Sequence, residues 1–339
     1  MTNPAVQYYN EGVNFANLGR FSEALASFDK AITINPDNVN AWLNRGVSLR
    51  QLGRHAEAVA SYDKAIAINP NDANTWNYRG YALVYLGRYT ETVESFDKAI
   101  AIKPDFDTAW NYRGYALVYL GRYTEAVESF DKAIAIKPDF DAAWNNRGYA
   151  LGELGRHAEA VESCDKAIVI NPNDTEAWHI RGIALNNLER HAEAVESCDK
   201  AIAINPDDAE AWHIRGVALN NLERHAEAVA SYDKAIAISP NYPNTWYDRG
   251  FALSNLGQYA KTVASFDKAI AIDPNNANTW YNRGFALINL QRYGEAVASY
   301  DRAIAIDPNN ANTWYNRALS QLITEYDEIK NPSMTRYDL

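Results

Sequence analysis

Apolar residues recur along the chain at spacings of three and four, in blocks that short polar turns separate. In residues 107–140 the first block places Trp110 and the leucines that follow it on one helical face, and it ends at Gly121. A second block covers residues 126–136 and ends at Pro138, because proline cannot continue a helix. The pattern therefore predicts two helices joined by a tight turn. Asp and Asn residues after the proline supply turn and N-cap chemistry for the next helix.

The predicted helix pair recurs with a fixed period of 34 residues. All nine tryptophans keep this spacing, at positions 42, 76, 110, 144, 178, 212, 246, 280 and 314, and so do nine of the twelve prolines. We number the slots of the repeat from Ala5, so that the tryptophans fill the fourth slot. A fixed period of this length indicates a stacked-repeat architecture.

The period predicts a leader at residues 1–4, nine repeats over 5–310, a capping helix at 311–330 and a tail at 331–339. The predicted repeats are 5–38, 39–72, 73–106, 107–140, 141–174, 175–208, 209–242, 243–276 and 277–310. Each repeat has glycine in the eighth slot, where it leaves room for close helix approach. Residues 311–330 have Ala318 in that slot, which fits a cap onto which no second helix packs.

The set of recurring residues resembles the tetratricopeptide repeat family. The resemblance depends on tryptophan in slot four, glycine in slot eight, a small residue in slot 20, an aromatic residue in slot 24, alanine in slot 27 and proline in slot 32. It implies an all-α fold, a right-handed superhelical α-solenoid of antiparallel helix pairs, in which first helices line a concave groove. The seventh slot departs from the family, which often has leucine where this chain has arginine.

The seventh-slot arginines have candidate partners, because every full repeat has aspartate in slot 25. Repeat one has Asp29 but Glu11 in the arginine slot, whereas residues 311–330 have Arg317 and no such aspartate. We therefore expect each aspartate to pair with the arginine of the next repeat, starting with Asp29 and Arg45, in partly buried, bidentate ion pairs. The alternative is that these are solvated charges that never meet.

The slots that would line the groove carry aromatic and amide residues, in blocks that change along the chain. The candidate binding residues of repeats three and four are Asn77, Tyr78, Tyr81, Tyr85, Asn111, Tyr112, Tyr115 and Tyr119. Those of repeats six to nine are His179, Asn186, Asn187, His213, Asn220, Asn221, Tyr247, Phe251, Tyr281, Asn282 and Phe285.

Tyrosine suits a binding surface because it combines apolar area with a hydroxyl group and loses little side-chain entropy. The alternative is that the tyrosine rings pack between neighbouring repeats. Side-chain amides can satisfy the backbone of an extended peptide whatever its sequence. The sixth-slot asparagines also resemble, incompletely, an asparagine ladder seen in superhelical repeats of this family; they are Asn10, Asn44, Asn146, Asn282 and Asn316.

The composition narrows the class of partner. A formal charge of −11 and a pI near 5.1 argue against nucleic acid, which needs a concentrated basic surface, and favour a neutral or basic protein or peptide. The sequence has no run of 18 apolar residues, so it predicts no membrane span. Residues 1–12 do not have the pattern of a signal peptide. The chain has two cysteines, which fits a reducing compartment, so we expect a cytoplasmic location.

The sequence predicts neither a metal site, nor a cofactor, nor catalysis. Four histidines, at 55, 157, 191 and 225, occupy slot 17, where they substitute for aromatic residues. His157 and Cys164 are seven residues apart, which is about 10 Å of helical rise and too far for one ion. We expect Cys164 and Cys198 to fill core space in the aromatic slot 24. His179 and His213 lie in groove slots and are candidates for a pH response.

The predicted function is therefore a non-catalytic scaffold that binds an extended peptide or a partner helix in its groove. The alternative is a structural solenoid that self-assembles weakly, by end-to-end stacking or by exchange of repeats or tail. Polar residues in helix 311–330 argue against stacking. The aromatic residues could stack on the bases of single-stranded RNA, but the negative charge of the chain argues against RNA binding.

Overall fold

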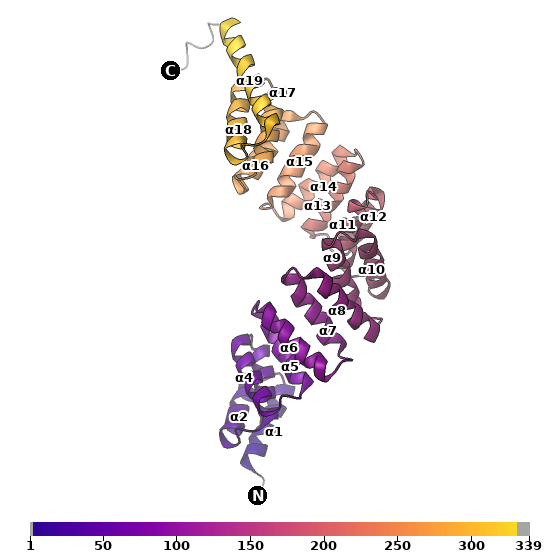
Figure 1. Cartoon of the computed structure of the whole chain (residues 1–339), viewed down its shortest axis with the longest axis vertical. Coiled ribbons are helices and arrows are strands. Elements are labelled where there is room, and N and C mark those ends of the chain that lie inside the picture. The colour runs from indigo at the N-terminus through magenta and orange to yellow at the C-terminus, as the bar shows by residue number, and fades with distance from the viewer. Residues whose placement is uncertain (1–2, 331–339) are drawn as a thin grey trace. The chain divides into compact units, whose positions relative to one another are not determined.

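The computed structural model describes residues 3–330, in which helices α1–α19 follow one another with no strand among them. It divides into two compact units, Met1–Pro172 and Asn173–Leu339. Residues 1–2 of the expected leader and the whole expected tail, 331–339, lie outside the described residues. The all-α solenoid of helix pairs predicted from the sequence is confirmed within these units (Figure 1).

The first unit contains ten helices in five pairs. They are α1 (Pro4–Asn17), α2 (Phe21–Ile34), α3 (Val39–Gln51), α4 (His55–Ile68), α5 (Ala73–Tyr85), α6 (Tyr89–Ile102), α7 (Asp107–Tyr119), α8 (Tyr123–Ile136), α9 (Asp141–Glu153) and α10 (His157–Ile170).

The second unit contains four pairs and one further, longer helix. They are α11 (Thr175–Asn187), α12 (His191–Ile204), α13 (Ala209–Asn221), α14 (His225–Ile238), α15 (Pro243–Asn255), α16 (Tyr259–Ile272), α17 (Ala277–Asn289), α18 (Tyr293–Ile306) and α19 (Ala311–Lys330).

The turn inside each pair depends on one residue in the left-handed region. In six repeats this fifteenth-slot residue is glycine with φ between 68° and 73°. Repeats six, seven and nine place Glu189, Glu223 and Gln291 there with φ of 59° to 60°, a conformation that costs energy for a residue with a Cβ. The turn geometry is therefore kept even where the sequence lacks glycine.

The two helices of a pair approach closely at the eighth-slot glycine. A Cβ on Gly114 would lie 2.6 Å from the Phe130 ring of the facing helix, and that ring is fully buried. In repeats five and six the ring is replaced by Cys164 and Cys198, both buried, as expected for residues that fill core space. Each pair therefore packs a slot-24 side chain against a bare helix backbone.

Within each unit the fourth-slot tryptophan holds a repeat to the one before it. The indole N–H of Trp42 donates to the carbonyl oxygen of Pro36 at 2.8 Å, and the same bond recurs in both units with N–O distances of 2.8–3.0 Å. This bond explains why tryptophan and proline share the 34-residue period, since each supplies one end of it.

The pairing of slot-25 aspartates with seventh-slot arginines is confirmed. Arginine Nε lies 2.6–2.9 Å from aspartate Oδ1 in eight pairs: Asp29–Arg45, Asp63–Arg79, Asp97–Arg113, Asp131–Arg147, Asp199–Arg215, Asp233–Arg249, Asp267–Arg283 and Asp301–Arg317. The arginine side chains are mostly buried, whereas about half of each aspartate side chain is exposed.

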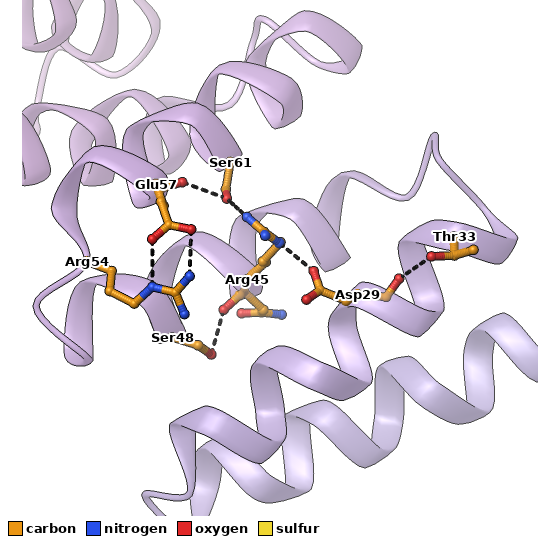
Figure 2. A network of polar contacts seen from close by, with 8 residues as sticks. Asp29, Thr33, Arg45, Ser48, Arg54, Glu57 and Ser61 are labelled. Atoms are coloured by element: carbon orange, nitrogen blue, oxygen red, sulfur yellow. Dashed lines mark hydrogen bonds and ion pairs between the residues drawn. The ribbon is translucent and has the colours of Figure 1, made fainter.

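The expected bidentate geometry was wrong, because the arginine divides its donors between two partners. Figure 2 shows Arg45 donating from Nε to Asp29 and from Nη1 to the Ser61 hydroxyl at 2.6 Å. The serine hydroxyl in turn donates to the Glu57 carbonyl oxygen one turn earlier. We call this aspartate–arginine–serine set the arginine relay; it connects the second helix of one repeat to both helices of the next.

Candidate functional site

The first helices of the pairs form the inner face of each unit. In the first unit α1, α3, α5, α7 and α9 contact one another in succession, and in the second unit α11, α13, α15, α17 and α19 do the same. Among the described residues of either unit, the second helices make no such contacts with each other. Helices that stack more closely on one side curve the stack toward that side, so the first helices line its inner face.

The tyrosines of repeats three and four both pack between repeats and reach the surface. Tyr81 of α5 meets Tyr112 of α7 edge to face, with ring centroids 4.5 Å apart, and both rings are only partly exposed. Tyr85 and Tyr119, at the ends of the same helices, are 68% and 55% exposed. The two uses expected as alternatives are thus divided among neighbouring tyrosines.

These tyrosines surround a cavity of about 410 Å³ on the inner face of the first unit. Its lining residues are Arg50, Tyr81, Val84, Tyr85, Tyr112 and Tyr115. Arg50 is its one cation, and the guanidinium lies 6.0 Å from the ring centre of Tyr78. We call this cavity the tyrosine pocket.

The exposed tyrosines are held by rings of the preceding repeat. Tyr85 stacks on His55 with centroids 4.6 Å apart, and Tyr119 stacks on Tyr89 at 4.5 Å. The Tyr119 hydroxyl also lies 3.0 Å from that of Tyr115. The stacking at His55 agrees with the expectation that slot-17 histidines substitute for aromatic residues.

Asn77 and Asn111 do not lie on the accessible face where the sequence analysis placed them. Each is only 4% exposed, because the fifth slot faces the first helix of the next repeat. The Asn111 side-chain oxygen accepts a hydrogen bond from Asn146 at 3.2 Å. Neither amide is therefore available to a peptide. Asn111 links repeats four and five, whereas the buried Asn77 side-chain oxygen has no hydrogen-bond partner among residues 3–330.

The sixth-slot asparagines also bond within the protein. Four of them donate to the fifth-slot residue of the preceding repeat at 2.8–3.2 Å: Asn44 to Tyr9, Asn146 to Asn111, Asn282 to Tyr247 and Asn316 to Tyr281. One donor of each amide is therefore committed to the neighbouring repeat, which weakens the expected role of these residues as a ladder for a peptide backbone.

In repeats six to eight the first helices carry a titratable network. His179 Nε2 lies 3.4 Å from the Glu210 carboxylate, and His213 Nε2 lies 3.5 Å from that of Asp248. The Thr245 hydroxyl lies 3.1 Å from His213 Nδ1. Both histidine side chains are largely buried, at 13% and 15% exposed, so they contribute little to the accessible surface.

The burial of this network shifts its ionisation. Burial lowers the pKa of His213, so the ring is neutral at pH 7, whereas burial raises the pKa of Asp248 to about 6. The contact with His179 lowers the pKa of Glu210, which therefore stays ionised at neutral pH. The network thus presents negative charge at neutral pH.

The amides beside this network divide into inner and outer members. Asn186 and Asn220 lie 2.6 Å and 2.8 Å from the ring nitrogens of His191 and His225, which fixes the helix junctions. Asn187 and Asn221 are exposed. Of the four candidates, the outer two are the ones that a partner can reach.

A further cavity of about 230 Å³ lies on α15–α17. Its walls are Phe251, Ser254, Asn255, Phe266, Tyr281, Asn282 and Phe285. Phe251 and Phe285 are 44% and 45% exposed, whereas Tyr247 and Tyr281 are partly buried and accept the asparagine bonds described above. This end of the inner face is therefore apolar at its surface.

Three features escaped the sequence analysis although signals for them were present. The relay serines occupy slot 23 of every full repeat, and Arg88 and Glu91 exemplify a recurring slot 16–19 ion pair. Helix α19 exposes apolar side chains at alternating spacings of four and three: Tyr315, Leu319, Leu322, Tyr326 and Ile329. The interpretation of this helix as a polar cap overlooked that stripe.

Within residues 3–330 no three histidine, cysteine, aspartate or glutamate residues converge as metal ligands would. None of the helices described there combines the length and the apolar character that crossing a lipid bilayer requires.

Family models for the tetratricopeptide repeat match throughout the chain. The matched segments are 9–73, 61–94, 80–118, 114–155, 142–174, 175–208, 197–230, 218–257, 253–291, 277–310 and 299–331. The comparison with curated protein sequences gives no match.

Among solved structures, the crystal structure of the APC/C hetero-tetramer Cut9–Hcn1 is 15% identical, covering 93% of this chain and 76% of that chain, with a TM-score of 0.58. A tetratricopeptide repeat protein from Parabacteroides merdae is 18% identical, covering 74% of this chain and 99% of its own, with a TM-score of 0.55. At these identities the likeness concerns the fold alone.

Proposed function

The chain belongs to the tetratricopeptide repeat family of protein-interaction scaffolds, and we propose that it is a non-catalytic scaffold that binds an extended peptide or partner helix along its first helices. In this proposal nine repeats over 5–310 present the binding face and helix 311–330 caps them. The proposed partner is a neutral or basic protein in the cytoplasm, and the proposal includes neither nucleic acid, nor membrane, nor cofactor.

One observation carries the proposal: large apolar side chains are exposed on the inner face of both units. Tyr85 and Tyr119 in the first unit, and Phe251 and Phe285 in the second, lie in groove slots beside cavities. Aromatic residues at the surface next to a concavity are typical of protein-binding sites. Stacking on His55 and Tyr89 holds the two tyrosines in place, which reduces the entropy that binding would cost.

The test is selection of binders from a random peptide display library on the full chain, followed by affinity measurement. The double variant Tyr85→Ala/Tyr119→Ala removes the exposed ring that lines the tyrosine pocket and the exposed ring beside it. The control Glu94→Ala/Glu128→Ala changes exposed second-helix residues of the same two repeats. We expect the tyrosine variant to lose affinity about tenfold or more for peptides that bind the first unit, and the control to stay within about twofold.

Circular dichroism on each variant reports whether the helices are retained. If the library yields no binder, or if the tyrosine and control variants bind every selected peptide alike, the proposed use of this face is wrong.

Self-assembly is a second candidate, because the apolar stripe of α19 suits another helix. Residues 315, 319, 322, 326 and 329 follow the alternating spacing of a two-stranded coiled-coil seam. In a parallel pair of α19 helices, Glu325 of one copy would flank the seam beside Lys330 of the other, with opposite charges.

Five seam residues form a small interface, so we expect weak, concentration-dependent dimers of the full chain. Sedimentation velocity over a range of protein concentration should detect them, and Leu322→Glu should abolish them. A wild type that remains monomeric at high concentration would rule out this second candidate.

A further inference from the structure

A cavity of about 220 Å³ in the second unit combines apolar walls with one carboxylate and one aromatic ring. Its lining residues are Ala209, Glu210 and His213 of α13, Ala235 of α14, Ser239 just after that helix, and Tyr242 and Thr245 at the start of α15. Ser239 and Tyr242 fill slots 31 and 34 of repeat seven.

The same two slots hold a cation against a ring elsewhere in the chain. In repeat three the Lys103 ammonium lies 4.7 Å from the ring centre of Phe106, and in repeat four Lys137 lies 5.0 Å from that of Phe140. These distances are those of cation–π contacts. A slot-34 aromatic residue in those repeats therefore comes with its own slot-31 lysine.

Repeat seven keeps the aromatic ring but replaces the lysine. Ser239 stands in slot 31, and no lysine or arginine of residues 3–330 lies over the Tyr242 ring or lines the cavity. The Tyr242 ring is half exposed. It meets the His213 ring edge to face, with 6.0 Å between the ring centroids. The cavity is thus lined by Ser239 in the slot where repeats three and four have a lysine.

The charged groups around the cavity favour a cation. The Glu210 side chain is 65% exposed, and its contact with His179 keeps it ionised at neutral pH. His213 is neutral there, and behind it stands the Asp248 carboxylate. Apolar walls at Ala209 and Ala235 suit the methylene stem of a long basic side chain.

We propose that this cavity is a subsite for a basic side chain, lysine or arginine, of the protein partner, whose cationic end lies between the Glu210 carboxylate and the Tyr242 ring. This inference rests on the proposed function and adds the chemistry of one partner residue. An ion pair at a partly exposed site and a cation–π contact act on the same group there.

The experiment uses peptides selected on the full-length wild type from the random library. In each peptide every lysine or arginine is replaced in turn by norleucine, which keeps the apolar stem and removes the charge. We expect peptides that bind the second unit to share one basic position, whose replacement lowers affinity at least about tenfold.

Two variants localise that position, and a third controls for charge. Glu210→Gln removes the carboxylate. Ser239→Lys restores the lysine of repeats three and four, which would fill the cavity from within. Asn205→Lys adds the same charge in slot 31 of repeat six, where slot 34 is Asp208 and offers no ring.

With Ser239→Lys the norleucine replacement should change affinity less than about twofold. With Glu210→Gln the loss should be smaller than in the wild type, because only the Tyr242 ring remains to hold the cation, whereas with Asn205→Lys the wild-type loss should persist. Selected peptides without a shared basic position, or an equal norleucine effect in all four proteins, would overturn the subsite and leave the proposed function standing. Failure to select any peptide would overturn both together.

Discussion

The same substitution, glycine to alanine, should have opposite effects at two neighbouring first helices. Gly114 of α7 faces the buried Phe130, and an added Cβ would lie 2.6 Å from a ring carbon. Gly152 of α9 has nothing within 4 Å of an added Cβ. Both glycines lie within helices, so the two variants differ in packing and not in secondary structure.

The magnitude follows from the distance. Carbon atoms pack at about 3.5–4.0 Å, so the Phe130 ring or helix α7 must move by about 1 Å to admit the methyl group. Overpacking of this kind costs about 1–3 kcal/mol, against about 0.5–1 kcal/mol gained by replacing glycine inside a helix. We therefore expect Gly114→Ala to lower the free energy of unfolding by about 1–2 kcal/mol and Gly152→Ala to raise it by about 0.5–1 kcal/mol.

Urea unfolding followed by circular dichroism measures the difference, and native-state hydrogen exchange of α7 and α8 amides localises it. A third variant, Gly182→Ala, meets the Cys198 sulfur at 3.0 Å and should cost less than Gly114→Ala. If Gly114→Ala proves as stable as Gly152→Ala, the eighth-slot glycine is not required by the facing ring and the packing argument is wrong.

Three other predictions concern the relay, the network and the turns. Arg79→Lys can reach Asp63 or the relay serine but not both, so urea unfolding should show a loss of about 1–2 kcal/mol, whereas Arg88→Lys in an exposed pair should change stability little. Burial raises the pKa of Asp248 to about 6, so between about pH 4 and pH 6 the folded state holds a proton that the unfolded state releases. The contribution of this proton to the free energy of unfolding is lost as pH rises through that range. Asp248→Asn should therefore be more stable than wild type by about 1–3 kcal/mol at pH 7 but equal to it near pH 4 in urea titrations, and an equal difference at both pH values would contradict the shift. Glu223→Gly should raise the midpoint of thermal unfolding, because its φ of 60° is strained for glutamate; an unchanged or lower midpoint would refute that strain.

The fold could be predicted because the same 34-residue pattern of packing and turn residues occurs nine times in one chain. Any single glycine or proline is weak evidence, but a period kept by all nine tryptophans admits one architecture. The aspartate–arginine pairs were found in the same way, from positions that share a period and from their absence at the two ends. What the period could not show was geometry: that Nη1 of Arg45 turns to Ser61 instead of doubling its contact with Asp29.

The candidate site was predicted less well, because slot spacing gives the face of a helix but not the depth of its neighbours. Asn77 and Tyr85 lie on one helix, yet the first is buried and the second is exposed, since the next first helix covers the fifth slot and not the thirteenth. Tyr242 was missed because its ring is a candidate cation site only where slot 31 has Ser239 in place of a lysine. Only the comparison with Lys103 and Phe106 in three dimensions makes that absence visible.

The contacts between repeats have a consequence for how such a chain can change its length. Removing residues 107–140 would leave Asp97 and Arg147 sixteen positions apart, the separation of every pair in the arginine relay. Pro104 and Trp144 would then lie six apart, the separation of the indole–carbonyl bond. Recombination between gene copies of the repeat can therefore delete or add whole repeats. The same contacts form again between the repeats that become neighbours, so the number of binding surfaces can vary without a new interface having to evolve.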